Sequence, residues 1–301
     1  MRKFLVNGIL FLLPIILYFV ALETIVGKIP NSYSYKYNYV KTHGKDIEAI
    51  AIGHSQLYDG FNPKLFHMPS FNLCNSSQTY VDNYHLLREL LPNMPHLKMV
   101  IMPIGYMNVG VGRSVSDFSY RSGYYYKYMH IDYDGQLPLK YAFESLRPLW
   151  ASQKVNLYYF KHGNVVGCDS LGRRNTNLLR NRIHPLGYDK LMQRYSRKSH
   201  KNFCLKDEEF FIATINMLLE RNISIVLVSP PYHRICYDKY NKDQLQFFKD
   251  YIQKFCSKYP VRYIDMESDT TFTDNDFFNE THVSEFGAEK LTERLNKELN
   301  L

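Results

Sequence analysis

Five short runs of apolar residues recur along the chain after residue 46, and most of them are continuous rather than alternating. A continuous apolar run of this length is typical of a strand that is buried on both faces of a parallel sheet. The runs are IEAIAIG (47–53), SFNLC (70–74), KMVIMPIG (98–105), ISIVLVSP (223–230) and VRYIDM (261–266).

Between these runs, apolar residues recur at the three- and four-residue spacing of amphipathic helices. Because strands and helices alternate, the pattern predicts an α/β fold with a doubly wound, five-stranded parallel sheet in a domain at 46–301. The last helix opens on Ser284, a residue type that favours the N-cap, and should bury Phe286, Leu291, Leu295 and Leu299. The predicted helices cover residues 81–93, 206–222, 243–260 and 284–299.

The N-terminus has the pattern of a membrane segment. Arg2 and Lys3 precede about nineteen uncharged residues, enough to cross a bilayer core of roughly 30 Å. We therefore predict an uncleaved transmembrane anchor at 1–26, with a cleaved signal peptide as the alternative. The positive charges at the extreme N-terminus place the bulk of the chain on the extracytoplasmic side, periplasmic or cell-surface. Residues 27–45 are polar and tyrosine-rich without helical periodicity, which is typical of a linker or of a segment that wraps around the periphery of the domain.

A long stretch after the third run breaks the alternation of strands and helices. Residues 106–201 are far longer than an ordinary loop, so we expect an insertion that has structure of its own and covers the carboxyl edge of the sheet. It contains the only tryptophan, Trp150, and three consecutive tyrosines at 124–126. The net charge of +8 is concentrated between Arg113 and Lys201, where sixteen Lys and Arg against six Asp and Glu leave an excess of ten and the remainder of the chain is near neutral. Such an excess suits an acidic partner, but an extracytoplasmic domain makes nucleic acid a poor candidate.

The five cysteines show neither a CxxC pair nor the spacing of a metal site, and no metal or cofactor is expected. One or two disulfides are possible in an oxidising compartment, although buried free thiols are favoured. The cysteines are Cys74, Cys168, Cys204, Cys236 and Cys256.

Candidate chemistry follows the predicted strands. The first strand ends on Gly53-His54-Ser55, and the second runs into NLCNSSQ (72–78). A histidine, His282, precedes the last helix within FFNETHVSEFGAEKLT (277–292). A serine hydroxyl becomes a nucleophile when a base takes its proton, and a parallel sheet can bring these two positions to one edge. A turn serine and a capping or solvated histidine are the ordinary alternatives.

These three motifs, in this order, resemble the SGNH (GDSL-type) hydrolase superfamily. The similarity is greatest to its membrane-anchored envelope branch, which includes proteins similar to DltD and to the alginate O-acetylation proteins. The resemblance implies a flavodoxin-like fold with Ser55 as nucleophile and His282 as base. Most members have an aspartate three residues before the histidine, where this chain has Asn279. A neutral asparagine still accepts the imidazole N–H but stabilises the imidazolium less, which puts activity in doubt. Asp276 or Glu280 could take its place, or a Ser-His dyad could suffice.

The resemblance also implies an oxyanion hole. Its donors would be the amide of Ser55, the amide at Ser77, where members commonly have glycine, and Asn108 after the third strand, although Tyr106 lies closer to the expected position. His54 stands where the family commonly has aspartate, and we expect it to fill the turn. His233, after the fourth strand, is either a pocket residue or an ordinary loop residue.

Two functions remain open from the sequence. The first is an envelope enzyme that moves or removes an acyl group, most simply acetyl, on a surface polysaccharide through an acyl-enzyme. An aromatic and basic insertion suits contact with sugars and acidic glycans. The second is a catalytically degenerate module that binds glycan or docks on a multi-span membrane acyltransferase, which Asn279 favours. Hydrolysis and transfer differ only in which acceptor reaches the acyl-enzyme.

Overall fold

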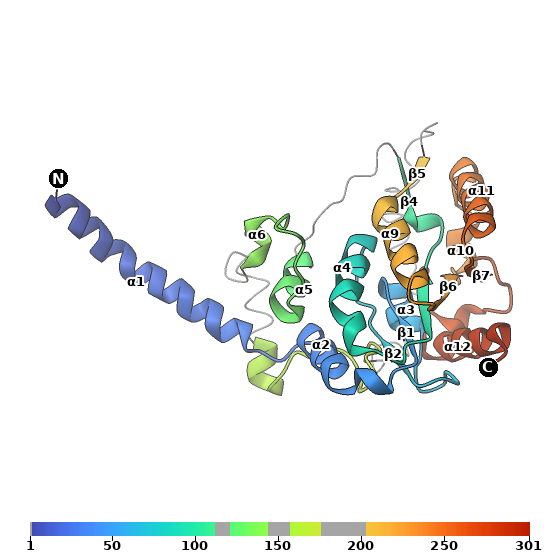
Figure 1. Cartoon of the computed structure of the whole chain (residues 1–301), viewed down its shortest axis with the longest axis horizontal. Helices are drawn as coiled ribbons and strands as arrows, with labels where there is room; N and C mark the ends of the chain where they lie inside the picture. Colours follow the sequence, from blue (N-terminus) through green and yellow to red (C-terminus); the bar gives the residue numbers. More distant parts are fainter. Residues whose placement is uncertain (1, 112–120, 144–156, 176–202) are drawn as a thin grey trace. The chain divides into compact units, whose positions relative to one another are not determined.

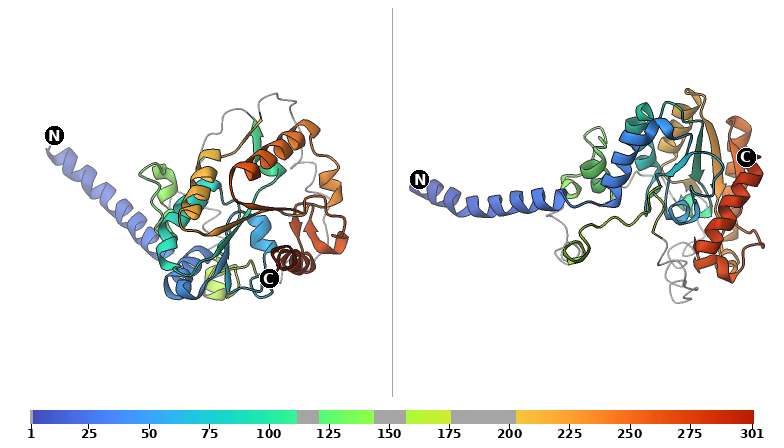
Figure 2. Two further views of the ribbon diagram at one scale, coloured as in Figure 1. Left: turned by 45° about the vertical axis from the view of Figure 1, so that its right-hand side comes forward. Right: turned by 90° about the horizontal axis from the view of Figure 1, so that it is seen from below.

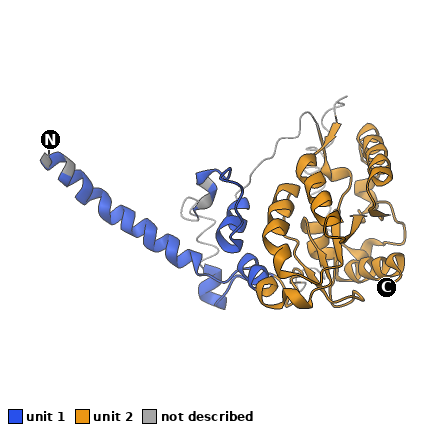
Figure 3. Ribbon diagram, in the orientation of Figure 1, with its two compact units in different colours: residues 1–38, 118–167 blue, residues 39–117, 168–301 orange. Residues whose placement is uncertain are grey.

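The structure is a computed structural model that describes residues 2–111, 121–143, 157–175 and 203–301. The chain divides into two compact units, one of residues 1–38 with 118–167 and one of residues 39–117 with 168–301 (Figure 3). The boundaries expected from the sequence, at 26 and 45, stay predictions.

The second unit is built around a five-stranded parallel sheet in the order β2-β1-β3-β6-β7 (Figure 1). Each of the five apolar runs contributes one of these strands, so the predicted α/β class and the parallel sheet are confirmed. The central strands carry aliphatic side chains that are almost fully buried, as expected when helices cover both faces. The strands are β1 (Ala49–Ala51), β2 (Ser70–Asn72), β3 (Met99–Pro103), β6 (Ser224–Ser229) and β7 (Arg262–Asp265).

The strand order reverses at β1, and the helices divide between the two faces accordingly (Figure 2). Crossovers between parallel strands are right-handed, so the helix from β1 to β2 lies on the face opposite to those of the later crossovers. α3 (Ser55–Gly60) packs with α12 (Glu285–Leu299), whereas α4 (Tyr80–Leu90) packs with α9 (Glu208–Leu219). α11 (Lys242–Lys258) joins α9 through its Phe255 ring, whose centroid lies 5.0 Å from that of Phe211.

Helix boundaries follow the expected capping chemistry. The Ser284 hydroxyl accepts the N–H of Gly287 and is the N-cap of α12, as predicted. Leu291 and Leu295 are fully buried, but Phe286 is 60 % exposed, so its place on the buried stripe was wrong. Two helical positions separate Phe286 from the buried Ala288, a rotation of about 200° that turns the ring to the opposite side of the helix.

Several elements of the second unit are too short to leave a periodic pattern in the sequence. They include a four-residue helix and two small antiparallel pairs, β4 with β5 and β8 with β9. These elements are α10 (Arg234–Tyr237), β4 (Val109–Val111), β5 (Phe203–Leu205), β8 (Phe277–Asn279), β9 (His282–Val283) and the 3-10 turns Gly44–Asp46, Leu91–Asn93, Tyr106–Asn108 and Asp274–Asp276.

The first unit begins with α1 (Arg2–Gly27), whose side chains are mostly exposed. Its residues Val6–Gly27 have a mean hydropathy of 2.5, so the helix is long and apolar enough to cross a membrane. Pro14 lies inside it without ending it.

The rest of the first unit is rich in tyrosine. Residues 27–45 were expected to be irregular, but the structure forms the helix α2 (Ser32–His43), which begins in the first unit. Its Tyr33 ring packs against those of Tyr124 and Tyr125, at centroid distances of 4.9 and 5.0 Å. Packing of rings therefore stabilises a helix that has no amphipathic period.

The two tyrosines opposite α2 belong to α5 (Ser122–Met129), which packs with α6 (Leu139–Ala142). Much of the predicted insertion at 106–201, including Trp150, lies outside the described residues. All five cysteines are free thiols, and Cys74, Cys168 and Cys236 are buried.

The end of β1 explains its glycine. Gly53 has a φ of +141°, a conformation that L side chains rarely adopt, and a Cβ atom there would lie 2.4 Å from Pro103 Cδ. Its carbonyl also accepts the N–H of Asn75 at 3.0 Å, which fixes the loop after β2 beside the end of β1. Close approach of the end of β1 to Pro103 therefore requires a residue without a side chain at position 53.

We expect Gly53→Ala to lower the free energy of unfolding by at least about 2 kcal/mol, because strain in φ and overlap with Pro103 add together. Chemical denaturation of the full chain in detergent measures the change. Gly110→Ala is the control, since a Cβ there meets only the flexible Lys206 side chain, at 3.1 Å or more, and should be nearly neutral. Equal stability of the two variants would contradict the steric explanation.

Candidate active site

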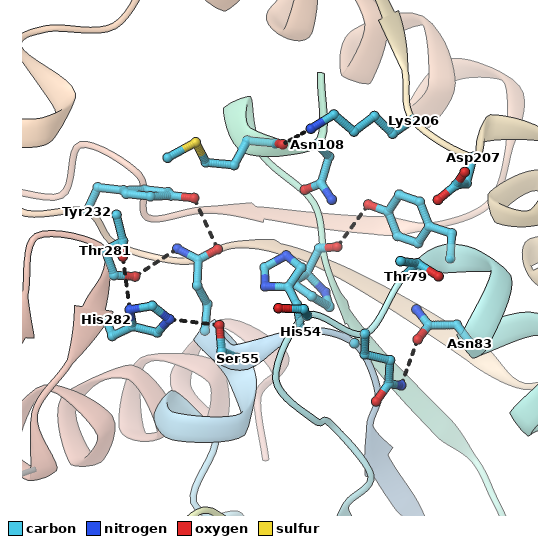
Figure 4. A pocket seen from close by; sticks show the side chains of 17 residues that line it. His54, Ser55, Thr79, Asn83, Asn108, Lys206, Asp207, Tyr232, Thr281 and His282 are labelled. Atoms are coloured by element: carbon cyan, nitrogen blue, oxygen red, sulfur yellow. Dashed lines mark hydrogen bonds between the residues drawn. The ribbon is translucent and has the colours of Figure 1, made fainter. Parts of the chain in front are cut away.

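Ser55 and His282 meet at the carboxyl edge of the sheet, although 227 positions separate them in the chain. Ser55 is the first residue of α3, directly after β1, and its Oγ lies 2.7 Å from Nε2 of His282 (Figure 4). This is hydrogen-bond distance between a hydroxyl and an imidazole. The geometry is that of a nucleophile with its base.

Two acceptors hold the other nitrogen of the imidazole. Asn279 Oδ1 and Thr281 Oγ1 each lie 2.9 Å from His282 Nδ1. The Asn279 oxygen also accepts the N–H and the hydroxyl of Thr281, which identifies it as the acceptor end of the amide. We therefore assign the proton to Nδ1, which leaves the Nε2 lone pair directed at Ser55.

The spacing of three between Asn279 and His282 comes from a hairpin. β8 ends on Asn279, β9 begins on His282, and these two residues are paired across the antiparallel ladder. Paired residues project their side chains on the same face, so the amide and the imidazole lie side by side. Thr281, in the turn, was not identified from the sequence.

The two alternative partners of the imidazole lie elsewhere. The Asp276 carboxylate accepts the N–H and the hydroxyl of Thr273 and forms an ion pair with Lys290. Glu280 is buried near Cys236, where its charge adds to the effect of burial in raising the pKa of the thiol to about 12. Of the three candidates, Asn279 is the residue in contact with His282.

A glutamine next to Ser55 is hydrogen-bonded to two other segments of the site. Gln56 is buried and donates from Nε2 to the carbonyl of Thr281 at 3.1 Å. Its Oε1 accepts the hydroxyl of Tyr232 at 3.1 Å, so one side chain links the ends of β1, of β6 and of the histidine hairpin. No motif in the sequence singled out this residue.

The proposed oxyanion donors border the same cavity. The N–H of Ser55 is among the first of α3 and so has no acceptor within the helix, which leaves it available to a ligand. Ser77 has a φ of 56°, the left-handed conformation that glycine adopts freely and a serine adopts at a cost of about 1 kcal/mol. Asn108 is oriented by the N–H of Gly105, which donates to its Oδ1 at 2.9 Å.

A buried carboxyl group supports the turn that carries Asn108. Glu267 Oε1 accepts the N–H of Tyr106 at 2.7 Å. Burial raises the pKa of Glu267 to about 8; the Tyr106 hydrogen bond opposes this and Asp265 adds to it. The protonated carboxyl that prevails at neutral pH can occupy this buried position without an uncompensated charge.

Two neutral imidazoles flank Ser55. Burial is the largest cause that lowers the pKa of His282 to about 3, and the electrostatic effects of Arg174 and His54 act in the same direction. Burial likewise lowers the pKa of His54 to about 4; a hydrogen bond with Asn108 opposes the shift and Lys206 adds to it. His54 therefore faces the cavity as a neutral side chain, which goes beyond the turn-filling role expected for it.

The positive charge near His282 comes from the predicted insertion. Arg174 Nε lies 2.8 Å from Asp59 Oδ1, its Nη2 donates to Ser76 Oγ at 2.5 Å, and its guanidinium covers the ring of Tyr58 at 4.8 Å. The neighbouring Arg173 forms an ion pair with Glu285. These contacts attach part of the basic stretch to α3 and α12, which composition alone did not indicate.

The site opens into a cavity of about 300 Å³ (Figure 4). Ser55, Ser77, Asn108 and His282 all line it, so four of the five predicted site residues share one cavity. Asn279 lies behind the imidazole. Within the described ranges, no group of three His, Cys, Asp or Glu side chains is placed to hold a metal ion. The rest of the lining is Gly53, His54, Gln56, Gln78, Thr79, Tyr80, Asn83, Pro103, Met107, Lys206, Asp207, Tyr232 and Thr281.

Comparison with known proteins does not assign the site. No protein-family model matches this chain, and no curated protein matches its sequence.

The lowered pKa of His282 makes stability depend on pH. Between pH 6.5 and about 3 the unfolded chain binds a proton at this histidine that the folded chain does not, so the free energy of unfolding decreases as the pH falls. We expect His282→Gln to lose less stability than the wild type between pH 6.5 and 4.5, as measured by urea denaturation. Parallel pH profiles of the two proteins would show that the imidazole is not held neutral.

Proposed function

We propose that this chain is a membrane-anchored, SGNH-type serine esterase or O-acyltransferase, acting on acyl esters, most simply acetyl, of an extracytoplasmic polysaccharide. The observation that carries the proposal is the hydrogen-bonded series from Ser55 through His282 to Asn279. The position of Ser55 after the first strand and of His282 before the last helix is similar to the arrangement of that superfamily. The long apolar α1 supports an anchor.

The reaction would begin with attack by Ser55. As the Oγ approaches the ester carbonyl carbon, His282 Nε2 takes the hydroxyl proton, and the carbonyl oxygen gains negative charge. The N–H groups of Ser55 and Ser77 and the amide of Asn108 are the candidate donors to that oxygen. Collapse of the tetrahedral intermediate expels the alcohol, which takes the proton from His282 and leaves the acyl group on Ser55.

The second half of the reaction reverses the first with a new acceptor. Water or a sugar hydroxyl gives its proton to His282 and attacks the acyl carbonyl; as the bond to Ser55 Oγ breaks, His282 returns the proton to that oxygen, which regenerates Ser55 and forms an acid or a new ester. Since the imidazole is neutral at neutral pH, it can act as a base in both halves. Which acceptor reaches the acyl group decides between hydrolysis and transfer.

Asn279 favours one alternative, a catalytically inactive glycan-binding or scaffold protein, which could also dock on a multi-span acyltransferase. An amide oxygen orients the imidazole but brings no charge to stabilise the imidazolium that forms when Ser55 is deprotonated. The serine–histidine geometry, in contrast, is complete, and a binding module would not require it. We therefore propose the enzyme rather than the inactive binding protein as the function of this chain.

A fluorophosphonate probe tests the nucleophile. We expect the full-length chain to react covalently with the probe, because Ser55 Oγ can attack phosphorus and displace fluoride. Ser55→Ala should abolish labelling in a gel assay. Ser257→Ala is the matched control and should label normally, since its hydroxyl is exposed on α11 and bonds Gln253 O. Absence of labelling in both the wild type and the control would favour the inactive alternative.

Substitution of Asn279 tests the role of charge. Asn279→Asp keeps the shape of the side chain and adds a carboxylate beside Nδ1, so turnover of an aryl acetate should rise at least about tenfold. Asn279→Ala should lower turnover less than His282→Ala, because Thr281 Oγ1 still accepts from Nδ1. A lower rate in Asn279→Asp than in the wild type would contradict this role.

A further inference from the structure

A second, larger cavity of about 710 Å³ lies between α10 and the segment that follows β7. Its volume falls in the roughly 300–1,000 Å³ range of small-ligand sites. It shares one wall with the site, because Tyr232 lines both cavities. Its lining is Tyr232, His233, Arg234, Tyr237, Asp238, Ser268, Asp269, Thr270, Phe272, Thr273, Asp274 and Asn275.

The composition of this lining restricts the ligand. Besides His233 and Arg234, its described residues are two tyrosines, a phenylalanine, three aspartates, three hydroxyl side chains and an asparagine, and none of them is aliphatic. Tyr232 and Phe272 are buried and form apolar surface, whereas the hydroxyl and carboxylate groups are mostly exposed at the rim. An apolar ligand would leave this polar rim without partners.

Charge makes an anionic ligand unfavourable. Among the described residues of the lining, Arg234 is the one Arg or Lys, and its Nε lies 3.4 Å from Asp238. Asp269 and Asp274 add two further negative charges. A phosphate or a uronate would therefore meet repulsion, and none of the described residues of 113–201 lines this cavity.

The arrangement of donors and acceptors also argues against a cation. An ammonium group offers donors alone, yet the hydroxyls of Ser268, Thr270 and Thr273 and the amide of Asn275 supply donors as well as acceptors. The three aspartates are not grouped for a metal: among the described residues no three such side chains can ligate one ion. A ligand with many hydroxyl groups satisfies both kinds of partner.

The aspartates are held in position and still have oxygens to offer. Asp269 Oδ1 accepts the N–H and the hydroxyl of Thr271, and Asp274 Oδ1 lies 3.1 Å from His233 Nε2. His233 Nδ1 accepts the N–H of Ile235, so its proton lies on Nε2 and donates to Asp274. Each carboxylate keeps acceptor sites for a ligand hydroxyl.

We infer that this cavity is a subsite for a neutral saccharide, whose C–H faces pack on the rings of Tyr232, Tyr237 and Phe272 while its hydroxyls bond the aspartates and the rim. A role of this cavity as the acceptor or polymer subsite of an acyl-transfer enzyme rests on the proposed function. Binding of a sugar there does not depend on that function. A sugar chain in this cavity would be separated from Ser55 by the side chains of Tyr232 and Gln56, which are hydrogen-bonded to each other.

Binding is tested with the full-length Ser55→Ala chain in detergent, so that no turnover occurs. The probes are the neutral pentasaccharides cellopentaose, maltopentaose and chitopentaose, with spermidine as the cationic comparison, observed by saturation-transfer NMR and calorimetry. We expect at least one pentasaccharide to bind, and Tyr237→Ala, which removes a ring that lines the second cavity alone, to weaken binding about tenfold. Tyr259→Ala, a half-buried tyrosine of the same unit outside both cavities, should bind as the parent does.

The outcomes separate this inference from the proposed function. No binding of any pentasaccharide, equal binding by the Tyr237→Ala variant, or preference for spermidine would overturn the subsite. Turnover of an aryl acetate by the wild type measures the reactivity of Ser55, because this small substrate does not need the second cavity. Saccharide binding without any such turnover would leave the subsite intact and contradict the enzyme.

Discussion

The hydrogen bond between Ser55 and His282 depends on an imidazole that stays neutral. Its Nε2 lone pair is free to accept the serine proton because burial disfavours the charged imidazolium and so keeps the imidazole neutral. Burial in turn depends on how tightly three segments converge: Gly53 lets the end of β1 approach Pro103, the loop after β2 bonds the Gly53 carbonyl, and Gln56 fastens the histidine hairpin. A looser edge would admit water, and a protonated imidazole could no longer act as a base.

Much of the fold and of the candidate site could be predicted from the sequence, and the reason is the same for the sheet and for the site. Strands buried on both faces need continuous apolar runs, so β1, β3 and β6 stand out in the sequence without any knowledge of their partners. Right-handed crossovers then place the ends of these strands on one edge. Ser55 follows such a strand directly, and its position was therefore fixed by topology rather than by its neighbours in the chain.

The features that the sequence did not reveal are those that depend on contacts between distant segments. Gln56 is an ordinary polar residue until Tyr232 and Thr281 are placed on either side of it. The helix α2 has no amphipathic pattern, because its tyrosines pack on other tyrosines rather than on an aliphatic core. Phe286 fits an apolar count but not the helical rotation that buries Leu291 and Leu295. Short pieces such as α10 carry too few residues for any period to appear.

The hairpin formed by β8 and β9 also limits how this site can vary. Its two-residue turn sets Asn279 opposite His282, so inserting or deleting a residue there would move the amide away from the imidazole. Asparagine and aspartate have nearly the same size and shape, which means that a single nucleotide change, such as one that turns an asparagine codon into an aspartate codon, could alter the charge at this position while the backbone stays as it is. The chain is thus one nucleotide change away from a carboxylate beside His282 Nδ1.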